Sequence, residues 1–256
     1  MPMTRHILIT GAAGAIGSAL CKRLADDHPE AHLTLVDINE AALLRMTASL
    51  PGRSSHAVWD LFQPEKLGTV WKRVIKANGP VDILVNCAGI MDIITFAETG
   101  WSQGWKLLAV NMISPMRLMD LALEDMPAGG SIINIASMAA RVPITGCAYY
   151  SSAKAGFAMA SEIARNELRD RGINVVTVYP GPIHSGLESH ARRQVEQGLV
   201  SRFIPTGSPE AVADRIATAC ARRQARVIYP DVFAVAHYFN GVSQWAVARL
   251  SPRPLK

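Results

Sequence analysis

Residues 5–17 read RHILITGAAGAIG, an apolar run followed at once by three glycines, Gly11, Gly14 and Gly17. The run predicts a strand over Arg5–Thr10, and the segment beyond it predicts a helix over Ile16–Asp26. Residues without a Cβ let the backbone turn sharply and approach a pyrophosphate at the N-terminus of that helix. Glycines at this spacing also occur in turns that only pack a strand against a helix, so the motif alone is a weak signal.

Asp37 strengthens the nucleotide interpretation. It ends a second predicted strand, Leu33–Asp37, and lies 20 residues after Gly17. A carboxylate at this place accepts hydrogen bonds from the adenosine ribose hydroxyls and repels a 2′-phosphate. The alanines between the glycines offer no cation for such a phosphate, so the sequence favours NAD over NADP. The simpler alternative is that Asp37 only caps the end of its strand.

Short apolar runs alternate with segments of helical period along most of the chain. Further strands are expected over Ser55–Asp60, Val81–Asn86, Ser131–Ala136, Ile173–Tyr179 and, as a possible seventh, Arg226–Tyr229. Helices are expected over Glu40–Leu50, Pro64–Ala77, Asn111–Glu124, Ala148–Arg169 and Pro209–Arg222. Most of the strands lack in/out alternation, which is typical of strands buried on both faces of a parallel sheet. The pattern predicts an α/β fold, a Rossmann-type doubly wound parallel sheet of six or seven strands flanked by helices.

The 256 residues are 49% hydrophobic and 18% charged, a composition that excludes a disordered tail. Without an internal repeat or a linker, residues 1–256 are expected to form a single dinucleotide-binding domain. Residues 182–208 contain Pro, Gly and His and are too long for an ordinary connection, so we expect a lid or substrate loop there. Residues 231–256 are expected to be a C-terminal helical extension.

The net charge of +5 is placed unevenly along the chain. Residues 191–256 hold ten Lys or Arg against four Asp or Glu, a balance of +6 that leaves −1 for the first 190 residues. These arginines are not interleaved with stacking aromatics, and no recognition helix accompanies them, so they indicate a solvated face and no nucleic-acid partner.

The four cysteines, Cys21, Cys87, Cys147 and Cys220, are spaced for neither a zinc knuckle nor a dense disulfide framework, and no metal is expected. They are interpreted as reduced thiols of a cytoplasmic protein. The first ten residues leave no room for a secretory leader. The apolar stretch Val232–Leu250 is interrupted by polar residues and does not read as a membrane span.

A second motif carries acid–base chemistry. Ser137 ends the fifth predicted strand, 13 residues before Tyr150, and Tyr150 and Lys154 stand four residues apart on one helix face. A phenol has a pKa of about 10, and a neighbouring ammonium is expected to lower it by favouring the phenolate. Ser137 can hydrogen-bond the same substrate oxygen. Tyr149 has the wrong spacing for this pairing and is expected to pack or to line the pocket.

Taken together, these motifs resemble the short-chain dehydrogenase/reductase family over about residues 5–186. The features that carry the likeness, in family order, are Thr10–Gly17, Asp37, Asp60, Asn86-Cys-Ala-Gly89, Asn111, Ser137, Tyr150 with Lys154, and Pro180-Gly181. The resemblance implies hydride transfer with Asn111, Ser137, Tyr150 and Lys154 as the catalytic residues. Asn111 would hold a water in a proton relay from Lys154.

The resemblance also implies a cofactor site. Its expected residues are Gly11, Gly14, Ala15, Ile16, Gly17, Asp37, Asp60, Leu61, Asn86, Ala88, Gly89, Tyr150, Lys154, Pro180, Gly181, Ile183 and Ser185. Asp60 would meet the adenine amino group, and Asn86 and Gly89 would brace the cofactor side of the sheet. Ser185 stands where the family has a threonine that bonds the nicotinamide carboxamide, and it keeps the hydroxyl.

The substrate is expected to be a small hydrophobic molecule, a steroid, terpenoid or acyl-chain ketone or alcohol. The expected walls are apolar: Met91, Ile93, Ile94, Phe96, Met138, Val142, Ile144, Leu187 and Phe203. Arg192, Arg193 or Arg202 would meet an anionic handle such as a carboxylate or a coenzyme A phosphate, although a solvated loop face is the simpler interpretation. Acyl thioesters therefore stay open.

The end of the chain departs from the family, whose last strand runs into an Asp-Gly-Gly-like turn. Here Gln224–Pro230 leads into an expected apolar helix over 232–250, with His237, Asn240 and Gln244 forming one polar stripe. Its apolar faces would pack on the substrate loop or on a second subunit of a homo-oligomer, a dimer or tetramer; peripheral membrane contact ranks lower. The alternative function is a non-catalytic NAD-binding regulatory or membrane-docking protein of the same fold.

Overall fold

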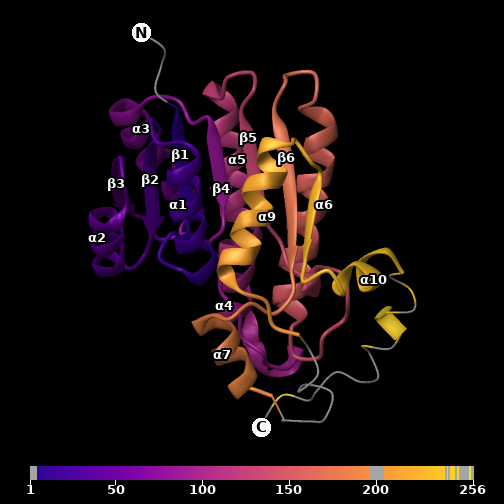
Figure 1. The fold of residues 1–256 in the computed structure, drawn as a ribbon. Coiled ribbons are helices and arrows are strands. Elements are labelled where there is room, and N and C mark those ends of the chain that lie inside the picture. Colours follow the sequence, from indigo (N-terminus) through magenta and orange to yellow (C-terminus); the bar gives the residue numbers. More distant parts are fainter. Residues whose placement is uncertain are drawn as a thin grey trace.

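The computed structural model describes residues 5–195, 205–239, 241, 243–245, 247 and 254. Its centre is a seven-stranded sheet of parallel strands in the order β3-β2-β1-β4-β5-β6-β7 (Figure 1). The strands are β1 (His6–Thr10), β2 (His32–Asp37), β3 (Arg53–Val58), β4 (Ile83–Asn86), β5 (Ser131–Ile135), β6 (Asn174–Pro180) and β7 (Arg226–Tyr229). The expected Rossmann-type doubly wound sheet is confirmed, with the seventh strand in place.

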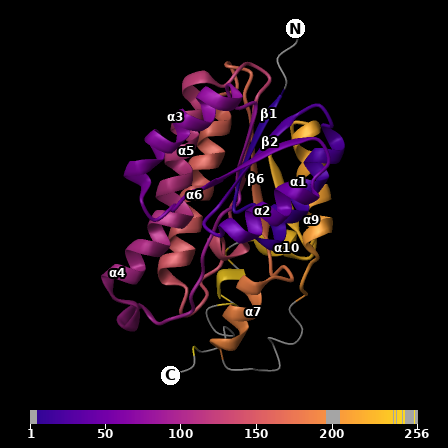
Figure 2. The same ribbon diagram turned by 90° about the vertical axis from the view of Figure 1, so that its left-hand side faces the viewer.

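Helices cover both faces of this sheet. They are α1 (Ala15–Asp27), α2 (Glu40–Ser49), α3 (Leu67–Asn78), α4 (Phe96–Leu108), α5 (Ser114–Asp125), α6 (Ala148–Glu167), α7 (Gly186–Arg193), α9 (Pro209–Ala221) and α10 (Phe233–Tyr238). The structure also describes three shorter helical segments, η1 (Pro64–Lys66), the π-helical η2 (Ala109–Ile113) and η3 (Met138–Ala140). Figure 2 shows α1 and α9 on one face and α3, α5 and α6 on the other.

The central strands β1, β4, β5 and β6 are mostly apolar because both of their faces are buried, whereas the outer strand β3 is polar and only partly buried. Ile7 and Ile9 of β1 pack with Leu20 of α1 and Ile216 of α9 in one core. Leu8, between them, points to the opposite core, which contains Trp71, Leu118 and Phe157 from α3, α5 and α6. Successive side chains of a strand alternate between faces, so a continuous apolar run serves two helix layers at once.

All the motif residues that follow a strand lie at one edge of the sheet, because parallel strands end on the same side. The strand order reverses between β1 and β4, which pair in register from Ile7–Ile83 to Thr10–Asn86. Such a reversal leaves a crevice outside the carboxyl ends of the strands, the usual ligand site of open α/β sheets.

Two expectations about helices were incomplete. The helix expected over Asn111–Glu124 is preceded by α4, which continues through η2 into α5, and Gly100 interrupts α4 with a φ of 66°. The stretch 182–208, expected to be irregular, contains α7, which Ser185 caps by accepting a hydrogen bond from the Glu188 amide over 3.0 Å.

The helix expected over 232–250 is broken at Phe239, and helical residues return at 241, 243–245 and 247. The helix α10 ends at Tyr238, and the backbone of Phe239 (φ −101°, ψ 51°) leaves the helical region. The expected polar stripe is divided: His237 is 4% exposed and Gln244 is exposed, whereas the neighbouring Val235 and Tyr238 are 63% and 67% exposed. Asn240, the middle residue of that stripe, lies outside the described residues. His237 points inward because its ring packs edge-on against the ring of Tyr179 in β6. The periodicity of the helix does not reveal this contact.

Within the described residues, no helix combines the length and the apolar character that a bilayer crossing needs.

Candidate active site

The glycine turn after β1 is built for close backbone contacts. Gly11 has a φ of 66°, and a Cβ there would lie 2.6 Å from the Cα atom of Ala88 in the turn after β4. A Cβ at Gly17 would lie 2.0 Å from the carbonyl oxygen of Gly11, so the helix start and the turn interlock. Gly14 is the N-cap of α1 and supplies no side chain. The first amides of α1, including those of Ala15 and Ile16, therefore face the crevice side of the sheet as a site for an anion.

Asp37 lies against this turn from the end of β2. Its Oδ2 accepts a hydrogen bond from the Ala13 amide over 3.0 Å, and its Oδ1 accepts one from the Asn39 amide over 3.1 Å. The carboxylate therefore fixes the glycine turn and leaves its remaining acceptor capacity for a ligand. Asp60, just beyond β3, is held by the Phe62 amide over 2.9 Å and by the Gln63 side chain over 2.7 Å.

Thr10 has a role that its place in the glycine motif does not reveal. Its Oγ1 accepts hydrogen bonds from the amides of Cys87 and Ala88 over 3.1 and 3.3 Å and donates one to the Val85 carbonyl over 3.3 Å. These bonds pin the end of β1 to the turn after β4. The residue type was the available signal, because a threonine hydroxyl can satisfy backbone groups that leave a strand ladder.

Ser137, Tyr150 and Lys154 come together as expected. Ser137 follows β5, its Oγ accepts a hydrogen bond from the Ala139 amide over 3.0 Å, and its hydroxyl is close enough to that of Tyr150 to lower the pKa of the phenol. Tyr150 and Lys154 lie one turn apart on α6, and both are buried. The Nζ of Lys154 donates a hydrogen bond over 2.8 Å to the carbonyl oxygen of Ile135, the last residue of β5. This carbonyl is a part of the site that no side-chain motif reveals.

The pKa of Tyr150 moves opposite to the sequence-based expectation. Burial of the phenol raises its pKa to about 12 and outweighs the hydrogen bond from Ser137, which lowers it. The expectation that Lys154 brings this pKa down is wrong for the protein alone, since the desolvation of the hydroxyl is the larger effect. Burial also lowers the pKa of Lys154 to about 8. Near neutral pH the pair therefore consists of a neutral phenol and a lysine that is largely cationic.

Asn111 joins the same cluster from η2. It is fully buried, its Nδ2 donates to the carbonyls of Ile90 and Leu107 over 2.9 Å each, and its Oδ1 accepts from the Ile90 amide over 3.3 Å. A Cβ at Gly89 would lie 3.0 Å from this Oδ1 and 3.5 Å from the Nζ of Lys154. Gly89 thus lets the amide and the ammonium approach one another.

Asn86 is placed for bracing the sheet. Its Nδ2 donates to Asn134 Oδ1 of β5 over 2.9 Å, and at 3.4 Å it also reaches the Pro115 carbonyl at the start of α5. Its buried Oδ1 has no hydrogen-bond partner among the described residues. Leu61 contributes through its backbone, because its carbonyl accepts a hydrogen bond from Ser114 over 2.5 Å.

The turn after β6 closes the site from the other side. The amide of Gly181 donates to the Tyr229 carbonyl over 2.7 Å, and Ile183 is buried and pairs with Gly207 in an isolated bridge. Residues 183 and 207 therefore hold the two ends of the α7 segment together. The Ser185 oxygen accepts the hydrogen bond that caps α7, and the hydroxyl hydrogen remains available as a donor.

Helix α7 is tied to the loop after β4, so it lies over the Tyr150 side of the sheet. The side chain of Gln194 accepts a hydrogen bond from the Ile93 amide over 3.0 Å, and His190 contacts Asp92 over 3.0 Å. Around Tyr150 an apolar cluster is formed by Ile93, Ala139, Cys147, Ala191 and Val195, with Met91 and Ile144 packed on it.

The remaining expected wall residues divide into different groups. Met138 is buried in a separate cluster with Tyr179, Ile94 and Val142 are half-buried, Phe96 and Leu187 are exposed, and Phe203 lies outside the described residues. Tyr149 packs as expected: its ring stacks on Phe96 at 5.4 Å. Arg192 is paired with Glu188 and Thr206, Arg193 is exposed, and Arg202 lies outside the described residues.

These features fit a dinucleotide. The glycine turn cannot accept a Cβ at Gly11 or Gly17, the N-terminus of α1 carries no side-chain cap within the described part of the chain, and Asp37 stands at the end of the neighbouring strand. Together they provide a backbone cradle for a pyrophosphate and a carboxylate for a ribose.

The model of the family described as short chain dehydrogenase matches residues 5–196. The chain belongs to this short-chain dehydrogenase family. Its oxidoreductase relatives include the 2,3-dihydro-2,3-dihydroxybenzoate dehydrogenase of Bacillus subtilis, 30% identical over 78% of this chain and 80% of the relative. They also include the "Probable oxidoreductase EphD" of Mycobacterium tuberculosis, 28% identical over 98% of this chain. This chain spans 44% of that longer mycobacterial protein.

Solved structures of short-chain dehydrogenases share the fold. A Brucella melitensis short-chain dehydrogenase/reductase is 25% identical and superposes with a TM-score of 0.77 over 88% of this chain and 94% of its own. A Burkholderia cenocepacia short chain dehydrogenase, solved in complex with NADP, is 27% identical, with a TM-score of 0.75 over 88% of this chain and 95% of its own. Membership of the short-chain dehydrogenase family therefore indicates a nicotinamide cofactor without deciding between NAD and NADP.

Proposed function

We propose that this short-chain dehydrogenase transfers a hydride between NAD(H) and a secondary alcohol or ketone with a bulky hydrophobic body. The observation that carries the proposal is the convergence of Ser137, Tyr150 and Lys154, with Asn111 beside them, at the carboxyl edge of the sheet next to the glycine turn. A nicotinamide cofactor, when bound, supplies or accepts the hydride. The glycine turn and Asp37 would hold its adenosine half.

In this proposal Tyr150 is the acid–base residue. Its hydroxyl is neutral near neutral pH because burial raises its pKa to about 12, so it holds the proton that a ketone oxygen needs on reduction. The Ser137 hydroxyl lies near this hydroxyl and would share the charge that develops on the substrate oxygen. In the oxidising direction the neutral phenol must give up its own proton as it takes the alcohol proton, and Lys154 and Asn111 would carry the released proton toward solvent.

Lys154 supplies positive charge one helical turn from Tyr150 and would hold the nicotinamide ribose. Its bond to the Ile135 carbonyl fixes the ammonium at the end of β5. Asn111 lies on the far side of Gly89 and would pass a proton from Lys154 toward solvent through a water. Pro180, Gly181, Ile183 and Ser185 would border the nicotinamide, with Ser185 donating to the carboxamide.

NAD is proposed as the cofactor because Asp37 carries a negative charge where NADP carries its 2′-phosphate. The two oxygens of Asp37 are fixed by the amides of Ala13 and Asn39, so the carboxylate is held in place rather than free to swing away. Like charges in contact disfavour NADP. The Burkholderia short chain dehydrogenase was solved in complex with NADP, so the preference proposed here for NAD rests on Asp37.

A hydrophobic substrate is proposed from the surroundings of Tyr150. Its ring lies in the apolar cluster of Ile93, Ala139, Cys147, Ala191 and Val195, which joins α6, α7 and the loop after β4. Each CH₂ group of a substrate buried against such a surface contributes about 0.8 kcal/mol. A steroid, terpenoid or acyl-chain compound gains more from this surface than a sugar does.

We further propose that residues 1–256 form one dinucleotide-binding domain. In it, residues 182–208 are the substrate loop and residues 231–256 are a C-terminal extension. The protein is proposed to be a homo-oligomer. The exposed Trp101 on α4 and Met159 and Ile163 on α6 suit a subunit contact. The four cysteines are free, and burial raises the pKa of Cys87 and Cys147 to about 12, which suits reduced thiols of the cytoplasm.

The test is a panel assay with NADH and NADPH on hydrophobic and on hydroxylated ketones, with the reverse reaction on the matching alcohols. The proposal expects turnover with NADH and a higher kcat/KM for the hydrophobic ketones. Cofactor binding without turnover across the panel would favour a non-catalytic role instead. A preference for small polyols would overturn the substrate class and leave the catalytic residues in place.

A further inference from the structure

Helix α10 contacts the turn that follows β6. A Cβ placed on Gly181 would lie 2.4 Å from Cε2 of Phe233, so the phenyl ring lies directly against the Gly181 backbone. Gly181 stands one residue beyond β6, in the turn proposed to border the nicotinamide. Phe233 therefore limits how far this turn can move away from the sheet.

The same helix contacts the segment that carries Ser137. Phe233 and Ala236 pack against an apolar cluster that contains Tyr179 and the residues on both sides of Ser137, Ala136 and Met138. Arg141, at the end of this segment, lies with a guanidinium nitrogen 3.5 Å from the His237 carbonyl oxygen. The short helix α10 thus contacts two separate parts of the proposed active site.

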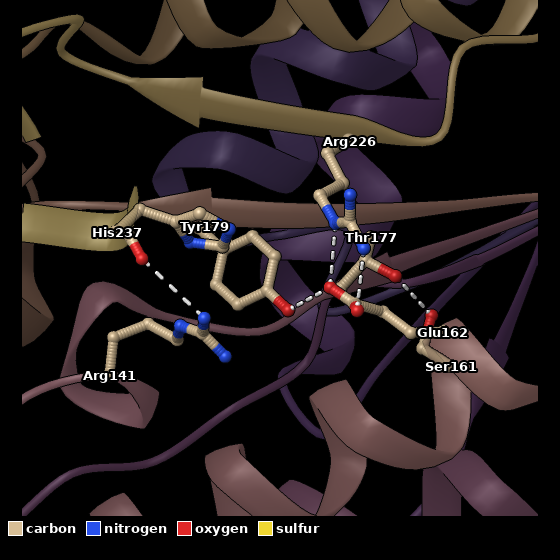
Figure 3. A network of polar contacts seen from close by, with 7 residues as sticks. All are labelled: Arg141, Ser161, Glu162, Thr177, Tyr179, Arg226 and His237. Carbon is tan, nitrogen blue, oxygen red and sulfur yellow. Dashed lines mark hydrogen bonds and ion pairs between the residues drawn. The ribbon is translucent and has the colours of Figure 1, made fainter. Parts of the chain in front are cut away.

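His237 is the buried centre of this contact. Its ring meets the ring of Tyr179 edge-on at 4.6 Å, and the hydroxyl of Tyr179 donates to Glu162 over 2.6 Å (Figure 3). Glu162 lies on α6, the helix that carries Tyr150 and Lys154, and Arg226 of β7 holds it by two bonds of 2.8 and 2.7 Å. The contacts of α10 therefore reach the catalytic helix as well.

The surroundings of His237 suit only its neutral form. The positive groups that face it are Arg141, after β5, and Arg226, on β7; its own helix adds Tyr238, and β6 adds Tyr179. The one facing carboxylate among the described residues, Glu162, is already paired with Arg226 and Tyr179. The Nδ1 of His237 and the Nε of Arg141 are both buried without a hydrogen-bond partner in the part of the chain that the structure describes. Burial and the two guanidinium groups lower the pKa of His237.

We propose that α10 is a positioning element of the active site, in which Phe233 and His237 hold the Gly181 turn against the Ser137 segment, and that proton uptake by His237 releases this hold. The inference rests on the proposed function, since it assumes that the Gly181 turn borders a nicotinamide. It gives the site a dependence on acid that Tyr150 and Lys154 do not explain, because the pKa values of these two groups, about 12 and about 8, lie higher.

The first experiment titrates NADH by fluorescence between about pH 5 and pH 8, the range in which histidine changes charge. The parent protein is expected to bind NADH about tenfold more weakly at the acid end, whereas His237→Gln, which is uncharged at every pH, should bind NADH equally well at both ends of the range, whatever its affinity at neutral pH. His28→Gln, at the opposite edge of the sheet, is the matched control and should lose affinity as the parent does. Equal acid losses in the parent and His237→Gln would overturn the release by protonation.

The second experiment measures amide hydrogen exchange in residues 131–141 and 177–186 near neutral pH. Phe233→Ala should speed exchange in both segments and weaken NADH binding, and Phe233→Leu, which restores bulk, should recover most of both. Val235→Ala removes an exposed side chain from the same helix and should change neither. If Phe233→Ala leaves both segments as protected as in the parent, α10 does not position them.

The two proposals fail in different ways. If the parent protein does not bind NADH, the proposed function fails, and the exchange experiment still decides whether α10 holds the two segments. If the parent binds NADH and reduces ketones but the exchange rates and the acid profile are insensitive to Phe233 and His237, only the positioning role is lost.

Discussion

The ammonium of Lys154 lies 2.8 Å from the carbonyl oxygen of Ile135, at the point where β5 ends and the Ser137 segment begins. This bond connects the catalytic helix to the sheet below the proposed substrate oxygen. It also holds a charged group in a buried place, and the cost of that burial appears as a pKa lowered from 10.5 to about 8. The cost can be measured without knowing the substrate.

Lys154→Met should remove this cost. In the folded state the ammonium loses its proton near pH 8 and in the unfolded chain near 10.5, so the unfolded chain binds more protons between these values. The parent therefore gains stability as pH rises through this window, by about 3 kcal/mol, and the variant does not. Urea unfolding at a series of pH values measures the difference. Lys72→Met, on the exposed face of α3, is the control, and its free energy of unfolding should rise with pH as that of the parent does. If Lys154→Met also shows this rise, the ammonium of Lys154 is not desolvated in the folded protein.

Asp37→Asn should separate the charge of this residue from its hydrogen bonds. Asparagine keeps an oxygen that accepts the Ala13 amide and removes the negative charge, so NAD binding should change little while NADP binding improves. The parent should bind NAD at least about tenfold more tightly than NADP, a difference of about 1.4 kcal/mol. Parallel calorimetric titrations with both cofactors measure the ratio. A parent that prefers NADP would show that Asp37 does not set the choice.

Gly17→Ala should disrupt the turn that cradles the cofactor. The added Cβ would lie 2.0 Å from the Gly11 carbonyl oxygen, so the helix start and the turn must move apart. We expect a lower melting temperature and no measurable NADH binding. Gly186→Ala is the matched control, since it also lies in the first turn of a helix and its Cβ meets nothing within 4 Å. If both variants bind NADH like the parent, the glycine turn does not form the cofactor site.

The burial of His6 should make the free energy of unfolding decrease in mild acid. Its ring is buried at the start of β1, hydrogen-bonded to the Gly79 carbonyl and to Thr34 over 2.9 Å each, and burial lowers its pKa. A histidine with a depressed folded-state pKa is equally neutral in both states above its unfolded value. As pH falls below about 6.5 the unfolded chain takes up the proton first, so the free energy of unfolding decreases.

His6→Gln should flatten this decrease, measured by denaturant unfolding between neutral pH and about pH 5. The exposed His184→Gln should keep the slope of the parent. A parent whose stability does not change over this interval would mean that the folded state accepts the proton on His6 without cost.

The fold was predictable from sequence because its signals are local. The continuous apolar runs of β1, β4, β5 and β6 are required wherever both faces of a strand are buried, and Gly11 and Gly17 are required wherever backbone must pass within van der Waals distance of backbone. The four-residue spacing of Tyr150 and Lys154 likewise places both on one face of any α-helix that contains them.

What the sequence did not reveal depends on contacts between distant segments. The helix α4 was not predicted because Gly100 and Gly104 interrupt its apolar pattern. The helix α7 was not predicted because its sequence is typical of a loop. The pKa of Tyr150 is raised because its hydroxyl is buried, and the spacing of residues in the sequence does not reveal that burial. The inward orientation of His237 depends on Tyr179, a residue of β6, so the periodicity of the helix alone assigned His237 to the wrong face.

The central claim is that Tyr150 is the acid–base residue of hydride transfer, and Tyr150→Phe tests it most directly. Phenylalanine keeps the ring within the apolar cluster of Ile93, Ala139 and Cys147 and removes only the hydroxyl. The measurement is the single-turnover rate of NADH oxidation by a hydrophobic ketone that the parent reduces, with the NADH dissociation constant determined on the same samples. The account predicts a rate at least about a hundredfold lower with NADH affinity unchanged. A rate equal to that of the parent would contradict it.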